Sequence, residues 1–294
     1  MVGGRGLVLG DESAVREPLL FVAVELSAGT PGVHADALVR KAVGIDRAWL
    51  PEEQVEVTAE VVFDPERQRV VAYRRERFAG LVIAEAEVPA PADEAARVLA
   101  EAAAADLGAA LPLSDPAVAS FLARLRFLAE HRPELGLPVF ADDELRALLP
   151  ALAAGRRSFD ELRRAPLLDV LQGQLGWERR QALEREAPER LEVPSGSRVR
   201  LVYEPGRPPV LPVRIQEMFG AAETPRVAGG RVPVLLHLLA PNQRPQQVTD
   251  DLAGFWRRTY PMVKKELAGR YPKHAWPDDP LTAAPERRPG RRSK

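Results

Sequence analysis

The sequence predicts an α+β fold built from three successive parts: a small β-barrel, an all-α subdomain and a mixed α/β domain. Three changes of pattern support this prediction. Apolar and polar residues alternate in residues 55–63, apolar residues recur at helical spacing after Pro91, and short apolar runs between turn residues follow Pro188. The predicted domains are residues 1–90, 91–188 and 189–280, followed by a disordered basic tail at residues 281–294.

The N-terminal part reads as five strands with one short helix. Val55–Phe63 alternates with a period of two, and the next four residues form a turn with Pro65 at its second position. The other strands are expected at residues 19–26, 35–43, 68–75 and 77–88, and the helix at residues 45–50. This set suits a small barrel, although the pattern alone does not separate one kind of small barrel from another.

The central part carries helix start signals. Asp115 is followed by Pro116, which suits the first turn of a helix. Ser158 and Glu161 have the spacing of a capping box, and further helices are expected at residues 167–175 and 177–186. The arginines of this part are interpreted as solvated helix surface beside acidic neighbours: Arg156, Arg157, Arg163, Arg164, Arg179 and Arg180.

The C-terminal part combines short strands with a long amphipathic helix. Val232–Leu239 is a continuous apolar run and suits a central strand. Thr249 is the expected N-cap of a helix over residues 249–269, in which Pro261 is expected to cause a kink or a new start after Thr259.

The net charge of −1 conceals a strong asymmetry along the chain. Residues 1–90 hold 10 Lys and Arg against 15 Asp and Glu, and residues 91–192 hold 13 against 18. Residues 193–294 hold 18 against 9, and still 13 against 8 without the basic tail. An excess of this kind predicts that the last third of the chain faces a polyanion.

No catalytic or metal-binding pattern stands out in the sequence. Cysteine is absent, the four histidines lack metal-ligand spacing, and no GxSxG or HExxH motif occurs. No signal peptide is evident, and the longest apolar runs are about half as long as a membrane helix requires. These observations favour a cytoplasmic protein without a membrane span, and they disfavour an independent enzyme.

Four stretches of the C-terminal part carry a resemblance to a known family. They are VRIQEMFG at residues 213–220, ETPRVAGGRVPVLLHLL at 223–239, QVTDDLAGFW at 247–256 and GRYPKHAWPDDP at 269–280. They resemble the C-terminal region of the bacterial HrpB-type ATP-dependent RNA helicases, a branch of the DExH-box family. The resemblance is ungapped and continues more weakly through the rest of the chain. It implies an OB-like barrel for residues 1–90, and as partners RNA or single-stranded nucleic acid and the motor domains of the same full-length protein.

The motor itself is missing from this sequence. No GxxxxGK followed by Ser or Thr occurs, and no DExH tetrapeptide occurs. We therefore expect no ATP hydrolysis by this chain alone, and ATP and magnesium only in the missing motor domains. Whether the chain counts as part of an enzyme is left open, because it reads as a C-terminal fragment or as a gene whose start is placed too far downstream.

The candidate nucleic-acid contacts lie in the most basic part. On a helical wheel Arg257, Arg258, Lys264 and Lys265 share one side, opposite an apolar arc that contains Phe255 and Trp256. The following segment interleaves aromatic and basic residues, which either stack on bases or close a core. Its candidates are Arg270, Tyr271, Lys273, His274 and Trp276.

A loop with two consecutive glycines is the remaining candidate. Arg226 and Arg231 flank Gly229 and Gly230, where the backbone could approach a phosphate closely, although a plain turn is favoured. Two functions therefore compete: an accessory nucleic-acid-binding region of an RNA helicase, and a protein-docking module that couples the helicase to a partner. Binding through phosphates weakens steeply with salt, whereas apolar docking does not.

Overall fold

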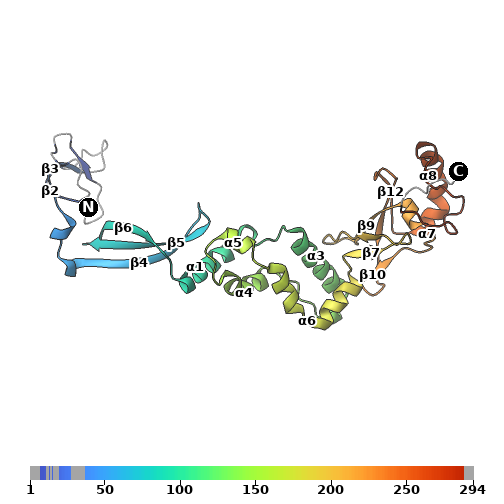
Figure 1. Ribbon diagram of the computed structural model, residues 1–294, viewed down its shortest axis with the longest axis horizontal. Helices are drawn as coiled ribbons and strands as arrows, with labels where there is room; N and C mark the ends of the chain where they lie inside the picture. The colour runs from blue at the N-terminus through green and yellow to red at the C-terminus, as the bar shows by residue number, and fades with distance from the viewer. Residues whose placement is uncertain (1–6, 11–12, 14, 16–19, 28–36, 288–294) are drawn as a thin grey trace. The chain divides into compact units, whose positions relative to one another are not determined.

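The structure, a computed structural model, describes residues 7–10, 13, 15, 20–27 and 37–287 (Figure 1). The chain divides into two compact units. The first unit combines Met1–Ala110 with Ala147–Arg164, and the second combines Leu111–Arg146 with Ala165–Lys294. Helix α4, Asp142–Ala153, begins in the second unit and ends in the first.

The first unit holds two separate three-stranded sheets. One has the order β1-β3-β2, with β1 parallel and β2 antiparallel to β3, and the other is an antiparallel meander β4-β5-β6. Two short 3₁₀ turns, η1 and η2, lie between the sheets in the sequence. The bounds are β1 Leu7–Leu9, β2 Phe21–Ser27, β3 Ala37–Gly44, η1 Arg47–Trp49, η2 Glu52–Gln54, β4 Val55–Asp64, β5 Arg69–Phe78 and β6 Leu81–Val88.

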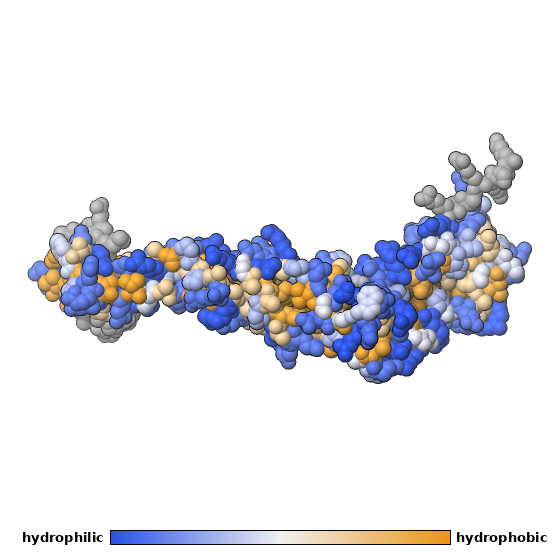
Figure 2. All heavy atoms as spheres, turned by 60° about the horizontal axis from the view of Figure 1, so that its bottom comes forward, coloured by the Kyte–Doolittle hydropathy of each residue, from blue (hydrophilic) through white to orange (hydrophobic). Residues whose placement is uncertain are grey.

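The described residues form no closed barrel, so the OB-like barrel is not confirmed. A barrel requires its first and last strands to pair, whereas β4 and β6 are edges of their own sheet. Alternation in the sequence specifies a strand and its two faces, but it does not specify which edges meet. Apolar side chains remain at the surface of these sheets, for example Val24 at 64% and Val57 at 53% exposure. Figure 2 shows such hydrophobic surface among hydrophilic residues at this end of the chain.

Short helices cover one end of the meander. They are α1 Ala92–Ala105, α2 Leu107–Ala110 and α5 Phe159–Arg163. Helix α1 contacts β4 and β5, where Val71 and Leu99 are buried, and the rings of Phe63 and Phe159 lie 4.7 Å apart. Ser158 caps α5 by accepting a hydrogen bond from the Glu161 N–H at 3.3 Å, as its capping-box spacing predicts.

The helical part of the second unit is built on α3 Pro116–His131 and α6 Leu167–Glu186, with η3 Pro133–Leu135 after α3. Asp115 caps α3 as predicted, since its carboxylate accepts from the next two free N–H groups. Helix α6 is kinked at Gly176, where φ is 72°, so the two predicted helices are present as its halves. The buried Arg124 of α3 donates to the carbonyl of Ala187 at 2.6 Å and ties the two helices together.

The C-terminal part has a three-stranded sheet of order β13-β12-β9 and two small hairpins, β7-β8 and β10-β11. The second half of the predicted strand Val232–Leu239 forms β12 in the centre of the sheet, whereas Val232 and Pro233 belong to the β10-β11 hairpin. Leu236 and Leu238 are fully buried. The bounds are β7 Arg190–Glu192, β8 Arg198–Arg200, β9 Val210–Arg214, the 3₁₀ turn η4 Ile215–Met218, β10 Arg226–Val227, β11 Val232–Pro233, β12 Leu235–Leu239 and β13 Pro245–Thr249.

The predicted long amphipathic helix is not one continuous α-helix. It consists of α7 Leu252–Gly254, a π-helical turn η5 Phe255–Thr259 and α8 Tyr260–Arg270. Pro261 explains the interruption, because it has no N–H to donate and suits only the first turn of a new helix. The N-cap is Asp251 rather than Thr249, since the Asp251 carboxylate accepts from the Gly254 N–H at 2.8 Å.

The first part of the predicted tail is held by hydrogen bonds. The Glu286 N–H donates to the carbonyl of Gln216 at 2.9 Å, and the Arg287 side chain donates to the Ser197 hydroxyl at 2.9 Å. The rest of the tail, residues 288–294, lies outside the described residues. The domain limits near Pro91 and Pro188 stay predictions.

Candidate nucleic-acid interface

An aromatic cluster anchors the segment that carries most of the candidate cations. Phe255, Trp256 and Tyr260 are buried, and the Phe219 ring lies 6.0 Å from that of Trp256 and 6.1 Å from that of Tyr260. The Trp256 indole N–H donates to the carbonyl of Ala221 at 2.8 Å, and the Tyr260 hydroxyl donates to that of Pro277 at 3.1 Å. Because this side is fixed against the domain, the opposite side of the segment faces solvent.

Two of the four helix cations have a carboxylate partner. Arg258 donates to Asp251 at 2.8 Å and Lys264 donates to Asp278 at 2.6 Å. The Gly254 N–H and then Arg258 lower the pKa of Asp251, and the hydrogen bond from Lys264 lowers the pKa of Asp278. Local carboxylates therefore offset the charge of Arg258 and Lys264.

The other two helix cations lack the ion pair that Arg258 and Lys264 each form. Arg257 and Lys265 are exposed, and neither makes an ion pair or a side-chain hydrogen bond with another described residue. Lys273 in the following segment is exposed in the same way, while Arg270 reaches Glu266 only at 3.9 Å. Among the candidate cations, Arg257, Lys265 and Lys273 are thus the exposed ones that form no ion pair or side-chain hydrogen bond with another described residue.

The aromatic residues of the next segment point to a structural role. Tyr271 and Trp276 are half-buried, and the Trp276 indole N–H donates to the carbonyl of Tyr271 at 3.0 Å. The ring of His274 meets that of Tyr271 edge-on at 6.3 Å. Burial and then the nearby Arg214 lower the pKa of His274, which favours the neutral form of this side chain. The geometry favours closure of a core over base stacking.

The double-glycine loop is a structural turn. Arg226 donates to the carbonyls of Gly230 at 2.5 Å and Arg231 at 3.0 Å, which braces the hairpin it belongs to. Three loop amides already have acceptors: that of Ala228 bonds to Glu186, that of Gly230 to Val227 and that of Arg231 to Ala228. A phosphate cradle needs free amides at this place, so the loop does not fit the phosphates of a nucleotide.

Arg231 belongs to a network that the sequence did not reveal. It donates to the carbonyl of His131 at 3.0 Å and to Glu134 at 2.6 Å. Arg132 binds both Glu134 and the buried carboxylate of Glu186, which also accepts from Arg185 at 2.9 Å. A hydrogen bond from its own backbone N–H and then Arg132 lower the pKa of Glu134 to about 2. The network joins the ends of α3 and α6 to the β10-β11 turn, and no local sequence pattern marks residues so far apart as partners.

The described residues contain no group of three or more His, Asp or Glu side chains arranged to hold a metal ion. None of the helices in the described part of the chain has the length and apolar character needed to cross a membrane.

Comparisons with known proteins agree with the resemblance in the sequence. Residues 148–280 match the family model described as ATP-dependent helicase C-terminal. The ATP-dependent RNA helicase HrpB of Escherichia coli strain K12 is 36% identical over 296 residues, which covers 98% of this chain. The chain is a C-terminal region of an HrpB-type helicase.

The relatives are much longer than this chain. The chain spans 36% of the length of the E. coli HrpB helicase. The crystal structure of the E. coli DExH-box NTPase HrpB matches with a TM-score of 0.67 at 34% identity, over 91% of this chain and 34% of that one. A second crystal structure, of the E. coli DEAH/RHA helicase HrpB, matches with a TM-score of 0.58 at 31% identity, over 87% of this chain and 32% of that one.

Proposed function

We propose that this chain supplies nucleic-acid binding to a cytoplasmic HrpB-type RNA helicase, and that it contacts RNA phosphates through Arg257, Lys265 and Lys273. The observation that carries the proposal is a property that they share: each is exposed, and none forms an ion pair or a side-chain hydrogen bond with another described residue. The excess of 18 basic over 9 acidic residues in residues 193–294 supports the same partner.

The paired cations have a different role in this proposal. Arg258 and Lys264 hold Asp251 and Asp278, while Arg226 and Arg231 hold the β10-β11 turn. A phosphate that took one of them would have to break an existing bond, so their net contribution to binding is smaller. Three free cations, rather than the full candidate set, are therefore the contacts we assign to RNA.

Binding of a labelled single-stranded RNA, measured over a range of salt concentrations, tests the proposal. Each lost single-strand phosphate contact lowers the salt slope by about 0.7, so changing Arg257, Lys265 and Lys273 to Gln is expected to flatten it by about 2. Affinity is expected to fall, while folding is retained because exposed substitutions cost little.

A matched control removes the same charge elsewhere. Arg40, Arg164 and Arg179 are exposed, and none makes an ion pair or side-chain hydrogen bond with another described residue. Their change to Gln is expected to alter RNA affinity only slightly. Equal losses in the two triple variants would show that net charge, and not this surface, binds the RNA.

A second candidate function has its own observation. Apolar side chains are exposed in the N-terminal part: Val22, Val24 and Leu26 on β2, and Trp49 on the following 3₁₀ turn η1. Surfaces of this kind favour association with another protein surface, and the motor domains of the helicase are the proposed partner. The test is association with a separately produced motor segment of an HrpB helicase. Changing Val22 and Val24 to Thr is expected to weaken that association without changing the salt slope for RNA.

A further inference from the structure

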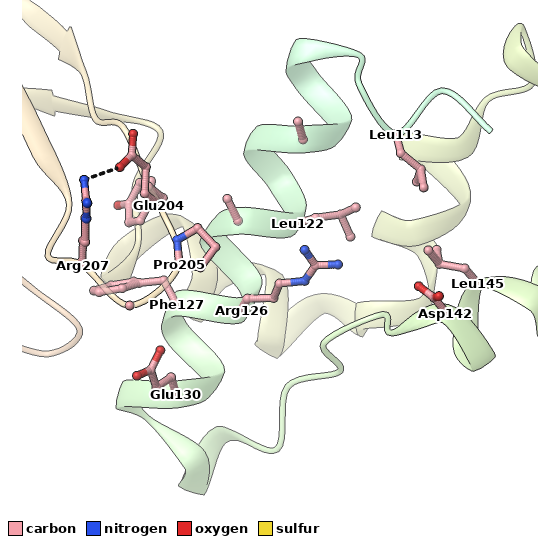
Figure 3. A pocket seen from close by; sticks show the side chains of 14 residues that line it. Leu113, Leu122, Arg126, Phe127, Glu130, Asp142, Leu145, Glu204, Pro205 and Arg207 are labelled. Atoms are coloured by element: carbon pink, nitrogen blue, oxygen red, sulfur yellow. Dashed lines mark hydrogen bonds and ion pairs between the residues drawn. The ribbon is translucent and has the colours of Figure 1, made fainter. Parts of the chain in front are cut away.

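The second unit also contains a groove that includes neither the candidate RNA-binding cations nor the aromatic cluster. The middle of α3, the start of α4 and the turn at residues 203–207 enclose a hollow of about 440 Å³ (Figure 3). Its floor is apolar, with Leu122 and Phe127 from α3 and Leu145 from α4. This volume lies within the roughly 300–1,000 Å³ range of pockets that hold ligands.

One positive charge lies in the middle of this apolar groove. Figure 3 shows the side chain of Arg126 extending from α3 toward Asp142 on α4. Arg126 is exposed, and its side chain makes no ion pair or hydrogen bond with another described residue. It also lines a second hollow, of about 610 Å³, beside Val139 and Asp143. The two hollows share Arg126 and Asp142 and therefore adjoin, and the second is the more open of the two.

The rim of the groove is acidic. Arg207 pairs with Glu204 at 3.4 Å and Arg146 pairs with Asp143 at 2.8 Å, which neutralises both arginines. Glu130 follows Arg126 after one helical turn and makes no ion pair with another described residue. A phosphodiester chain would face these carboxylates at every point except Arg126. The charge pattern therefore disfavours nucleic acid and matches a segment that carries both signs.

We propose that this groove binds a short peptide segment of a protein partner. The peptide places a large apolar side chain over Leu122 and Phe127 and a carboxylate on Arg126, and a basic residue of the peptide meets Glu130. This function is separate from the RNA contact proposed above and does not depend on it. A peptide suits this groove because its apolar side chain can cover the apolar floor, while its acidic and basic residues can pair with Arg126 and Glu130.

A random peptide library displayed on phage, selected on the full chain, is the test. Ala119 is exposed and lines the groove, so the longer side chain of the Ala119→Gln variant occupies part of the groove. Gln is a good helix former, so helix α3 is expected to be retained. Peptides that also bind this variant are discarded during the selection. We expect enriched peptides to share an acidic residue close to a large apolar one. For an enriched peptide, Arg126→Glu is expected to lower affinity by about tenfold or more. Replacing the acidic residue of the peptide by Lys is expected to restore binding to that variant.

The control is Arg179→Glu, which reverses another exposed and unpaired arginine of the described chain, on α6. Thermal unfolding of all variants checks that the fold is retained. The proposal is overturned if no peptide is enriched, if enriched peptides lack the acidic residue, or if Arg126→Glu and Arg179→Glu have equal effects. It is also overturned if single-stranded RNA displaces the peptide, which would assign the groove to nucleic acid.

Discussion

Two three-stranded sheets differ in how deeply most of their apolar residues are buried. In the C-terminal sheet Leu211, Leu236 and Leu238 are fully buried, although Val248 at its edge is 48% exposed. In the N-terminal meander Val71 on the central strand is buried, whereas Val57 and Val82 on the edge strands are 53% and 49% exposed. Both sheets form from strands with apolar and β-branched residues. The difference shows that a local pattern is sufficient for a strand, while burial depends on which other elements pack against the sheet.

The two regions also differ in how many of their charged side chains are paired. In the meander Arg75 bonds to Glu60 and Glu85 on the neighbouring strands, so opposite charges alternate across the sheet. In the C-terminal part the exposed cations Arg257, Lys265 and Lys273 have no such partner among the described residues. The comparison separates an apolar, internally neutralised surface from an open cationic one, and surfaces of these kinds suit different partners.

The largest expected difference between the two regions is in the unfolding free energy that is lost when an apolar side chain is truncated to Ala. Leu236→Ala removes a fully buried side chain and is expected to cost about 2–5 kcal/mol of unfolding free energy. Val57→Ala is expected to cost less than about 0.5 kcal/mol, because that side chain is already half-exposed. Urea unfolding followed by tryptophan fluorescence measures both, since Trp256 lies in the C-terminal part and Trp49 in the N-terminal one. Equal costs would contradict the contrast in burial.

A smaller difference in stability is expected between alanine substitutions at two glycines, one in each region. Gly80 and Gly229 both have positive φ, 80° and 63°, but a Cβ at Gly80 meets nothing within 4 Å whereas one at Gly229 collides with Arg132. Gly80→Ala is expected to cost about 1–2 kcal/mol for the left-handed backbone alone. Gly229→Ala is expected to cost more, because Arg132 must leave Glu186. Thermal unfolding decides the order, and an equal or reversed order would show that Arg132 moves aside freely.

The smallest expected effect is a pH dependence confined to the C-terminal part. The pKa of His274 is lowered by burial, so the unfolded chain takes up a proton below about pH 6.5 that the folded chain resists. Stability therefore falls as pH drops below about 6.5, and the loss ends below the folded pKa. The carboxylates with lowered pKa values, such as Asp278, act only at lower pH.

The matched variant for this effect is His274→Gln. It is expected to remove the slope of unfolding free energy that begins below about pH 6.5 and to leave unchanged the loss of stability caused by the carboxylates at lower pH. Chemical unfolding at a series of pH values measures it. A slope that persists in the variant would assign the titration to another group.

Much of the secondary structure could be predicted from short-range signals. The cap at Asp115, the capping box of Ser158, the central strand Leu235–Leu239 and the new helix start near Pro261 were all readable, because each depends on residues within one or two turns of chain. The missing phosphate loop was equally readable, since that motif is contiguous.

Only the tertiary structure determines which charged side chains are paired with an opposite charge and which remain unpaired. Asp278 follows Lys264 by 14 residues and Glu134 precedes Arg231 by 97, so no helical wheel could show that these cations are paired and that Lys265 is not. Closure of a barrel is a similar case, because it depends on which strand edges meet rather than on how each strand alternates. Local sequence determines which elements form, while pairing across the chain determines which surfaces remain open for a partner.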